Sequence, residues 1–588
     1  MIQSVSLNWR QLLLQKYWNR YSQCHNTRSF SLDPMGGRLS PQPPDLYIET
    51  ESGPYEHISE EDLYRHTRRR WLCNEQKELS KRYVRFDLQE LIRAALDVSD
   101  GSRYCTRLFK CLEGLHNKAF ILTMDNGVEV FAKLPNSSAG PARYTTASEV
   151  ATYDMLREVF KVPVPRVLAW STDATNNSVG AEYIIQEKVQ GVRLGSLWNQ
   201  WPRKAKFNLI KQVVDMENKL ITIAFPWHGC IYYKDDLLSL TGDAKALTVD
   251  SVAPEALERF AIGPLTSAEL WTGARKDMKL DRGPWRNPIQ YTQALGKNEI
   301  GWIKSHAKSR MNHYRSMEDQ EHPEDGLALL TQYMDAASYL IPSSDDEVAS
   351  SNVLWHPDLH LDNVYVDPNT HEITSIIDWQ SACVAPLFYQ SAVPRMFQHP
   401  KPVREGWAVP QKPENFDSLS EEEQNEIQKD LESEAMHKYY EAQVYKRAPR
   451  HWSVLQRKTI PIMRKPVELV TGLWERRNLF FLRQSLIVLA AYWEEVYSDS
   501  GLTCPLQFTK PDLELYQEEE ENIDGVGQLL TILHDQVLLP HDGMVRSEDY
   551  EAAVRISRKI KEIFLGLAQD ETQRELFSKL WPYQETED

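Results

Sequence analysis

The stretch LWHPDLHLDNV, residues 354–364, decides the fold of this chain of 588 residues. It is the densest group of polar side chains in the sequence, and β-type residues stand on both sides of it. Fifteen residues after Asn363, an apolar run ends abruptly at Asp378, within the sequence IIDWQ. An apolar strand that ends in an aspartate presents a carboxylate at its tip, and carboxylates are preferred ligands of Mg²⁺.

These residue types suit phosphoryl transfer. Mg²⁺ is a hard cation that takes one or two carboxylates, an amide oxygen and the phosphates of a nucleotide. Asp378 and Asn363 can supply the protein oxygens. A second carboxylate must stand apart from the metal, orient the acceptor hydroxyl and accept its proton. Asp358, five residues before Asn363, is the predicted catalytic residue, and Asn363 and Asp378 are the predicted metal ligands.

The order His-x-Asp-x-x-x-x-Asn, followed by an Asp, resembles the catalytic loop and the metal-binding Asp of protein kinases. The forms His-Pro-Asp-Leu-His and Ile-Asp-Trp are more similar to the aminoglycoside phosphotransferase and choline kinase branch, the phosphotransferase enzyme family. The resemblance covers about residues 104–395. It implies ATP and Mg²⁺ as cofactors and a small-molecule acceptor of unknown identity. We expect His356 to stiffen the loop by hydrogen bonding, and His360 to support the loop or to lie on the substrate side.

The resemblance also implies an α+β, bilobal protein-kinase-like fold. A small N-terminal lobe with an antiparallel sheet and one helix would precede a large, mainly helical C-terminal lobe with a helical C-terminal extension. The expected units are a transit peptide (1–30), a linker (31–66) and a nucleotide-binding lobe with leading helices (67–188). A catalytic lobe with a helical insertion (189–395) and the helical extension (396–588) follow.

A kinase-like N-terminal lobe needs a strand lysine paired with a helix glutamate. Lys133 lies in the second strand of a hairpin predicted around Asn126-Gly127, because both of these residues tolerate positive φ. Glu149 follows in a predicted helix, on a face that is otherwise apolar. An unpaired buried charge costs several kcal/mol, so Lys133 is the expected partner. The alternative is that Glu149 forms a capping box with Thr146.

Two further segments resemble nucleotide-binding parts of the family. Residues 112–120 resemble the turn that covers the phosphates, although they contain one glycine only. Residues 183–189 form a predicted strand that resembles the linker whose backbone binds adenine. The resemblance assigns nucleotide contacts in these segments to Gly114, Asn117, Gln186 and Lys188.

The first thirty residues contain no Asp or Glu and carry four basic residues among leucines and aromatics. This composition is typical of a mitochondrial transit peptide, and the charges interrupt the apolar run that a secretory signal needs. Cleavage is expected after Phe30, which would change the net charge from −17 to −17 − 4 = −21. We therefore expect a location in the mitochondrial matrix. Residues 68–71 (RRRW) and 283–285 (GPW) also resemble fungal mitochondrial members, the "altered inheritance of mitochondria" proteins.

Composition excludes several classes of protein. The chain is 41% apolar and 26% charged, which is typical of a globular protein. Its most apolar run, residues 485–493, is half of what a spanning helix needs, so no transmembrane segment is expected. A net charge of −17 disfavours nucleic acid as a partner. The seven cysteines form no C-x-x-C pair and so indicate no disulfide framework or structural zinc site.

Two alternatives to an active kinase remain. A nucleotide-binding pseudoenzyme could serve as a mitochondrial maintenance factor without turnover. The alternating trio His356, Asp358 and His360 could instead bind zinc or iron in a hydrolase, although this leaves Lys133 and Glu149 unexplained. The sequence also predicts a helix over residues 67–83, an irregular insertion over residues 230–330, and a solvated helical turn at the acidic run 518–521.

Overall fold

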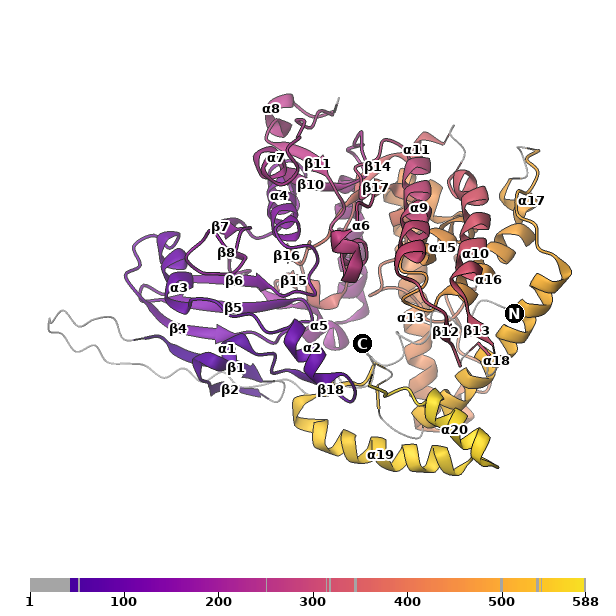
Figure 1. The fold of residues 1–588 in the computed structure, drawn as a ribbon. Coiled ribbons are helices and arrows are strands. Elements are labelled where there is room, and N and C mark those ends of the chain that lie inside the picture. The colour runs from indigo at the N-terminus through magenta and orange to yellow at the C-terminus, as the bar shows by residue number, and fades with distance from the viewer. Residues whose placement is uncertain are drawn as a thin grey trace.

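The computed structural model describes residues 43–585, apart from short gaps at 51–52, 250, 314, 317–318, 343–345, 405, 498–500, 536–538 and 541. The predicted transit peptide lies outside the described residues, as does the first part of the predicted linker. The described chain forms a sheet-rich N-terminal lobe beside a larger helical lobe (Figure 1). This bilobal α+β arrangement confirms the fold class.

The N-terminal lobe is built on a seven-stranded sheet in the order β2-β1-β4-β5-β6-β8-β7. All neighbours are antiparallel except β1 and β4. The predicted hairpin joins β5 to β6, and Gly127 has φ +84° in its turn. Apolar residues of helix α3 (Leu88–Asp97) pack against residues of β4 and β5. The strands are β1 (Asp45–Thr50), β2 (Gly53–His57), β4 (Cys105–Lys110), β5 (Asn117–Met124), β6 (Glu129–Pro135), β7 (Val167–Ser171) and β8 (Tyr183–Glu187).

Two predictions for the N-terminal part are wrong. From Asp45 onward the predicted linker is folded, because β1 adds to β4 and extends the sheet, and α1 (Glu60–Tyr64) follows. The predicted helix over 67–83 is instead β3 (Arg69–Trp71) followed by α2 (Glu75–Lys81). β3 pairs with β18 (Met544–Arg546), and a strand partner more than 470 residues away leaves no local pattern.

The larger lobe is mainly helical. Helix α6 packs against α13, while α9, α10, α15 and α16 form a second bundle. The insertion contributes a strand pair, β10 and β11, and β10 contacts α4 (Tyr144–Glu158) of the N-terminal lobe. The principal elements are α6 (Arg203–Leu220), α7 (Lys234–Thr241), α9 (Pro288–His306), α10 (Pro323–Ala336), α13 (Glu421–Arg447), α14 (Pro449–Leu455), α15 (Ile460–Val470), α16 (Leu479–Ala491), β10 (Cys230–Tyr233) and β11 (Phe260–Gly263).

Short strands frame the stretch 354–364. β14 pairs with β17, and β15 pairs with both β16 and β9. Their bounds are β9 (Val192–Arg193), β14 (Asn352–Leu354), β15 (Val364–Val366), β16 (Ile373–Ile376) and β17 (Val384–Pro386), with α12 (Leu387–Gln390) after them.

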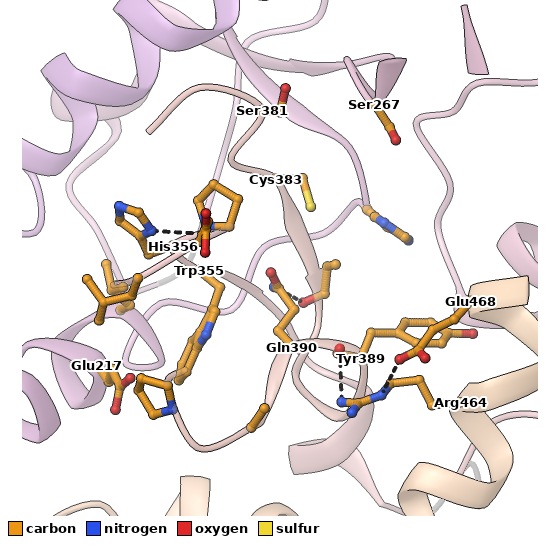
Figure 2. A pocket seen from close by; sticks show the side chains of 18 of the residues that line it. Glu217, Ser267, Trp355, His356, Ser381, Cys383, Tyr389, Gln390, Arg464 and Glu468 are labelled. Atoms are coloured by element: carbon orange, nitrogen blue, oxygen red, sulfur yellow. Dashed lines mark hydrogen bonds and ion pairs between the residues drawn. The ribbon is translucent and has the colours of Figure 1, made fainter. Parts of the chain in front are cut away.

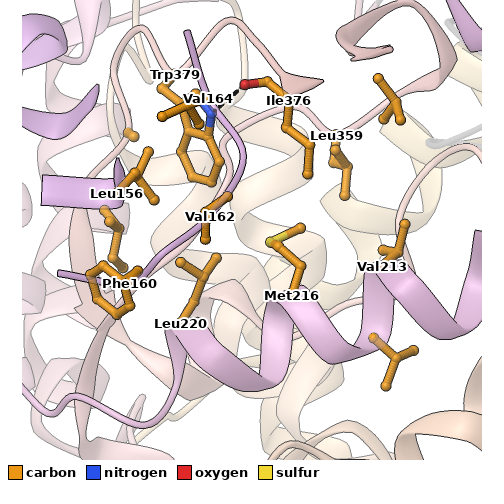
Figure 3. Packing of buried hydrophobic residues seen from close by; sticks show 14 of the residues in the cluster. Leu156, Phe160, Val162, Val164, Val213, Met216, Leu220, Leu359, Ile376 and Trp379 are labelled. Atoms are coloured by element: carbon orange, nitrogen blue, oxygen red, sulfur yellow. Dashed lines mark hydrogen bonds between the residues drawn. The ribbon is translucent and has the colours of Figure 1, made fainter. Parts of the chain in front are cut away.

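A buried apolar cluster packs α6 against the stretch 354–364 and the end of β16. Met216 and Leu220 of α6 lie close to Leu359, Ile376 and Trp379, as Figure 3 shows. Burying one large apolar side chain contributes about 1.5–3 kcal/mol. Packed apolar side chains therefore hold the stretch 354–364 and the end of β16 in place.

The C-terminal helices run back beneath both lobes toward the N-terminal sheet (Figure 1). Helix α18 (Lys510–Asp535) contacts α16, and it is followed by β18, α19 (Tyr550–Gly566) and α20 (Glu571–Leu580). The predicted solvated turn in α18 is wrong at Glu519, which is 1% exposed and forms ion pairs with Arg315 and Arg483. Among the described residues, no helix is both long and apolar enough to cross a membrane.

Candidate active site

One lysine joins three elements of the two lobes. Nζ of Lys133, on β6, lies 2.7 Å from Oε1 of Glu149 on α4 and 3.1 Å from Oδ1 of Asp378. The sequence had predicted the first pair. The capping alternative is wrong, because α4 begins at Tyr144 and the hydroxyl of Thr146, inside the helix, donates to Glu182.

The electrostatics of this triad favour a charged lysine. Burial alone would lower the pKa of Lys133, but the carboxylates of Glu149 and Asp378 outweigh burial and raise it. Burial likewise opposes ionisation of Asp378, yet Lys133 holds the pKa of that carboxyl below its usual value. Burial raises the pKa of Glu149, and the ammonium opposes this rise. The side chain of Asp378 is 49% exposed, so its carboxylate is accessible to a ligand.

Helix α4 also holds the backbone of Asp378. The N–H of Asp378 donates to the hydroxyl oxygen of buried Tyr153, at 3.0 Å. Asp378 has φ +63°, a left-handed conformation that costs about 1–3 kcal/mol in a residue other than glycine. Tyr153 belongs to the helix face that the sequence predicted to be apolar apart from Glu149, and the sequence analysis assigned it no role. The signal was a hydroxyl on that face, one turn after Glu149.

His356 ties the loop to the strand end. Its Nε2 lies 3.0 Å from the carbonyl oxygen of Ile377, and its Nδ1 accepts a hydrogen bond from the N–H of Asp358 at 3.1 Å. Burial lowers the pKa of His356 to about 4, so the ring is neutral and carries its proton on Nε2. Both nitrogens are therefore engaged with the backbone.

The rest of the loop is similarly organised. Nδ1 of His360 accepts from the N–H of Asp362, and its Nε2 lies 3.7 Å from Oδ2 of Asp358. Nδ2 of Asn363 donates to the carbonyl oxygen of Asp358, which leaves the amide oxygen of Asn363 for another ligand. Arg395 approaches Asp358 to 3.8 Å from the other side.

Strand register brings the two predicted metal ligands together. Val364 pairs with Ile376, and the N–H of Ile377 donates to the carbonyl oxygen of Asn363. Asn363 and Asp378 therefore flank the same end of the β15–β16 pair. A half-exposed carboxylate beside an amide oxygen suits Mg²⁺, which takes its remaining ligands from phosphates and water.

The trio of the hydrolase alternative lacks metal-binding geometry. The two Nδ1 atoms of His356 and His360 accept backbone N–H groups, and Nε2 of His356 faces a carbonyl. Within the described ranges, no three His, Cys, Asp or Glu side chains gather as a metal site. The arrangement thus offers no support for zinc or iron at this loop.

The predicted nucleotide-binding residues fall into two groups. The amide of Asn117 donates to Gln380, two residues after Asp378, which brings it to the strand end. Gly114 lies in an exposed turn, with open space where a Cβ atom would stand. Gln186 is buried within the sheet, where β8 pairs with β6 and β7 on its two edges, and Lys188 forms an ion pair with Glu129. Nucleotide contacts of these two residues remain predictions.

A cavity of about 590 Å³ opens beside the loop (Figure 2). Asp358 lies on its wall, together with residues of α6 and of the insertion. Helix α15 also lines it through Arg464, Val467 and Glu468. Sequence analysis did not predict this, because α15 belongs to the predicted C-terminal extension. The volume is in the range of small-molecule sites.

Comparison with known proteins identifies the family of the chain. The family model of the phosphotransferase enzyme family matches residues 301–397, which include the loop and Asp378. A subtelomeric hrmA-associated cluster protein of Aspergillus fumigatus is 31% identical over 519 residues, or 82% of this chain and 98% of the relative. The chain belongs to the phosphotransferase enzyme family.

Two proteins of lower identity are also similar. Altered inheritance of mitochondria protein 9, mitochondrial, of Saccharomyces cerevisiae is 23% identical over 447 residues, or 71% of this chain and 68% of the relative. The crystal structure of a putative aminoglycoside phosphotransferase from Ralstonia eutropha is 13% identical, with a TM-score of 0.32, and the match covers 75% of this chain and 99% of that one.

Proposed function

We propose that this chain is an ATP-dependent phosphotransferase that acts on a hydroxyl group of a small molecule. The observation that carries the proposal is the pairing of Lys133 with both Glu149 and Asp378, beside a cavity whose wall includes Asp358. Lysine, helix glutamate, metal-binding aspartate and loop aspartate are the parts that phosphoryl transfer requires.

Each residue has a proposed part in the reaction. Mg²⁺ bound with ATP would neutralise charge on the transferred phosphoryl group, held by Asp378 and the amide oxygen of Asn363. Lys133, oriented by Glu149, would hold the nucleotide phosphates. Asp358 would accept a hydrogen bond from the acceptor hydroxyl and then its proton as the oxygen attacks. Its N–H bond to His356 fixes the position of the loop for this step.

Two observations support a mitochondrial location. The first thirty residues have the composition of a transit peptide. The yeast relative, whose name includes "mitochondrial", is similar over 71% of this chain. The matrix remains our proposal for the compartment.

The decisive experiment separates an enzyme from a nucleotide-binding protein without turnover. Asp378→Ala should weaken MgATP binding and transfer together, because the metal loses its carboxylate. Asp358→Asn should keep nucleotide affinity within about twofold and lower transfer by about 10²–10⁴. Melting temperature with and without MgATP, and ATP consumption with a metabolite panel, measure the two effects. Full function in cells with Asp358→Asn, but not with Asp378→Ala, would show that only nucleotide binding matters.

A further inference from the structure

The two arginines on the wall of the cavity each form an ion pair with a carboxylate on the same wall. Nε of Arg464 lies 2.8 Å from Glu468, and its guanidinium also donates to the carbonyl oxygens of Tyr389 and Ser391. Arg395 lies 3.8 Å from Asp358. An ammonium or a phosphate group of a ligand would have to displace one of these pairings. The described walls therefore favour neither a strong cation nor a strong anion.

One acid of the cavity has no cationic partner in the described chain. Glu217, on α6, is 2% exposed, and its Oε2 accepts a hydrogen bond from the hydroxyl of Tyr440 at 2.6 Å. Burial raises the pKa of Glu217 to about 8, and the Tyr440 hydrogen bond offsets only part of this rise. Glu217 is therefore a neutral acid at pH 7, which can both donate and accept hydrogen bonds.

Two buried polar atoms on the walls lack a partner in the described chain. They are Nδ1 of His228 and the hydroxyl of Tyr389. Burial lowers the pKa of His228 to about 3, so this ring is also neutral. A buried polar atom without a hydrogen bond is costly, so a ligand that reaches these two atoms and supplies the missing bond would gain affinity. A hydroxyl group can supply it in either direction.

The surfaces between these polar groups are aromatic. The ring of Tyr291 lies 4.4 Å from His228 and 5.5 Å from Tyr389, measured between centroids. Trp355 lies on the side of the cavity near Glu217, as Figure 2 shows. Aromatic faces that alternate with neutral hydrogen-bonding groups suit a molecule with both C–H faces and hydroxyl groups.

We propose that the acceptor is a neutral, polyhydroxylated molecule of the sugar or polyol class, with one hydroxyl at Asp358 and others at Glu217, His228 and Tyr389. This inference rests on the proposed function, since it names the acceptor for the same site. Glu217 in its acid form is the discriminating group. A cationic amino alcohol would instead require Glu217 to be ionised.

The test uses the full-length chain with MgATP and two sets of acceptors. The neutral set is glycerol, myo-inositol, ribose, glucose and trehalose, and the cationic set is ethanolamine, choline and kanamycin. Calorimetry measures binding, and release of ADP together with the phosphorylated product measures transfer. We expect binding within the neutral set only. Binding confined to the cationic set, or no binding in the neutral set at millimolar concentration, overturns the inference.

Variants of Glu217 sharpen the test. We expect Glu217→Gln to raise the Kd of the neutral acceptor about threefold, because an amide keeps one donor and one acceptor, and Glu217→Leu to raise it about thirtyfold or more. Equal losses in both variants would overturn the inference. Tyr389→Phe removes one hydroxyl and keeps the aromatic ring, so it should raise the Kd of the neutral acceptor about fivefold. This variant tests the inference if Glu217→Leu does not fold.

The dependence on pH gives a second readout. The Kd of a neutral acceptor should rise above pH 8 in the wild type, as Glu217 ionises, and stay flat with Glu217→Gln. A Kd that falls above pH 8 overturns the inference. The charged and titratable groups that line the cavity with Glu217, or contact it from α13, are Tyr440, Asp358, His356, His228, Arg395, Arg464, Glu468, Tyr291, Tyr389, Cys230 and Cys383. If a molecule of the neutral set binds with this dependence on Glu217 but no phosphorylated product forms, the proposed function fails, and only the assignment of a neutral polyol to the cavity stands.

Discussion

The hydroxyl of Tyr153 holds the backbone N–H of Asp378 at 3.0 Å, while Lys133 holds the side chain of the same residue at 3.1 Å. Tyr153 and Glu149, which binds Lys133, are one turn apart on α4. A single helix of the N-terminal lobe thus controls both the backbone and the carboxylate of the candidate metal ligand. Any displacement of this helix would change the geometry of the strand end.

Tyr153→Phe tests the backbone contact. The ring keeps its packing, but the N–H of Asp378 loses its acceptor, so stability should fall by about 1–3 kcal/mol. We expect the affinity for MgATP to fall about tenfold, because the left-handed backbone of Asp378 loses its support. Thermal melting and nucleotide titration give both numbers. Tyr183→Phe, on β8, is the matched control and should change neither stability nor MgATP affinity. An unchanged MgATP affinity in Tyr153→Phe would contradict the prediction.

The pair Lys133–Glu149 should show strong coupling. Lys133→Met leaves two carboxylates without their ammonium and should cost about 3–5 kcal/mol, the usual cost of breaking a buried pair. Glu149→Gln should lower MgATP affinity as well as stability. In a double-mutant cycle, we expect a coupling energy of about 1–3 kcal/mol from chemical denaturation. Additive effects would mean that the two side chains do not interact in solution.

The buried acid Glu217 predicts a pH dependence of stability. Its pKa rises from 4.5 in the unfolded chain to about 8 in the fold, so the native state holds a proton that the unfolded state releases. Below pH 4.5 Glu217 is protonated in both states, so the free energy of unfolding is at its highest with respect to this group. It falls as pH rises toward 8, because the unfolded state releases the proton and the native state does not. Glu217→Gln should therefore gain stability relative to wild type over this interval, on the order of 3 kcal/mol. A stability difference that is constant from pH 5 to pH 8 would refute this.

The C-terminal helices are predicted to stabilise the turn near Gly114. Ser547 donates to the carbonyl oxygen of Thr67, and the N–H of Thr67 donates to Glu113, a buried acid that also pairs with Lys118. The core of this C-terminal unit includes Phe564, which is fully buried.

Phe564→Ala should therefore loosen the unit, at a cost of about 3–5 kcal/mol, and speed amide exchange in residues 67–72 and 113–118. The exposed neighbour Ile563, 54% accessible on the same helix, provides the control variant Ile563→Ala, with an effect within about 0.5 kcal/mol. Hydrogen exchange monitored by mass spectrometry would compare the two. Faster exchange confined to residues 540–585 would show that the C-terminal unit does not support the turn.

The acid-free leader should direct the chain to mitochondria. A C-terminal fluorescent fusion should co-localise with a matrix marker, and deletion of residues 1–30 should leave it in the cytosol. The mature chain from mitochondria should begin at Ser31, as N-terminal sequencing would show. A cytosolic signal that is the same with and without the leader would disprove the location.

Local patterns predicted much of the site. The hairpin around Asn126-Gly127, the strand position of Lys133 and the helical face of Glu149 follow from turn chemistry and periodicity, which act over a few residues. The Lys133–Glu149 contact followed from the cost of a buried charge. By contrast, Tyr153 could not be assigned, because an aromatic residue on an apolar face has the same pattern whether or not its hydroxyl binds the backbone.

Long-range pairings explain the errors. Residues 67–83 contain a strand because β3 meets β18, and Glu519 is buried because Arg315 and Arg483 converge on it from distant segments. The sequence shows a polar run in both places, and polar runs are usually solvated. Only the fold brings the partners together.

By itself the sequence determined the family, the order of the chemical groups and the spacing of Asp358, Asn363 and Asp378, because order and spacing are properties of the chain before it folds. The tertiary structure decided the contents of the cavity: that α15 lines it, that its ion pairs are matched, and that Glu217 is buried beside Tyr440. Desolvation and pairing depend on which side chains meet in space, and spacing along the chain does not record this.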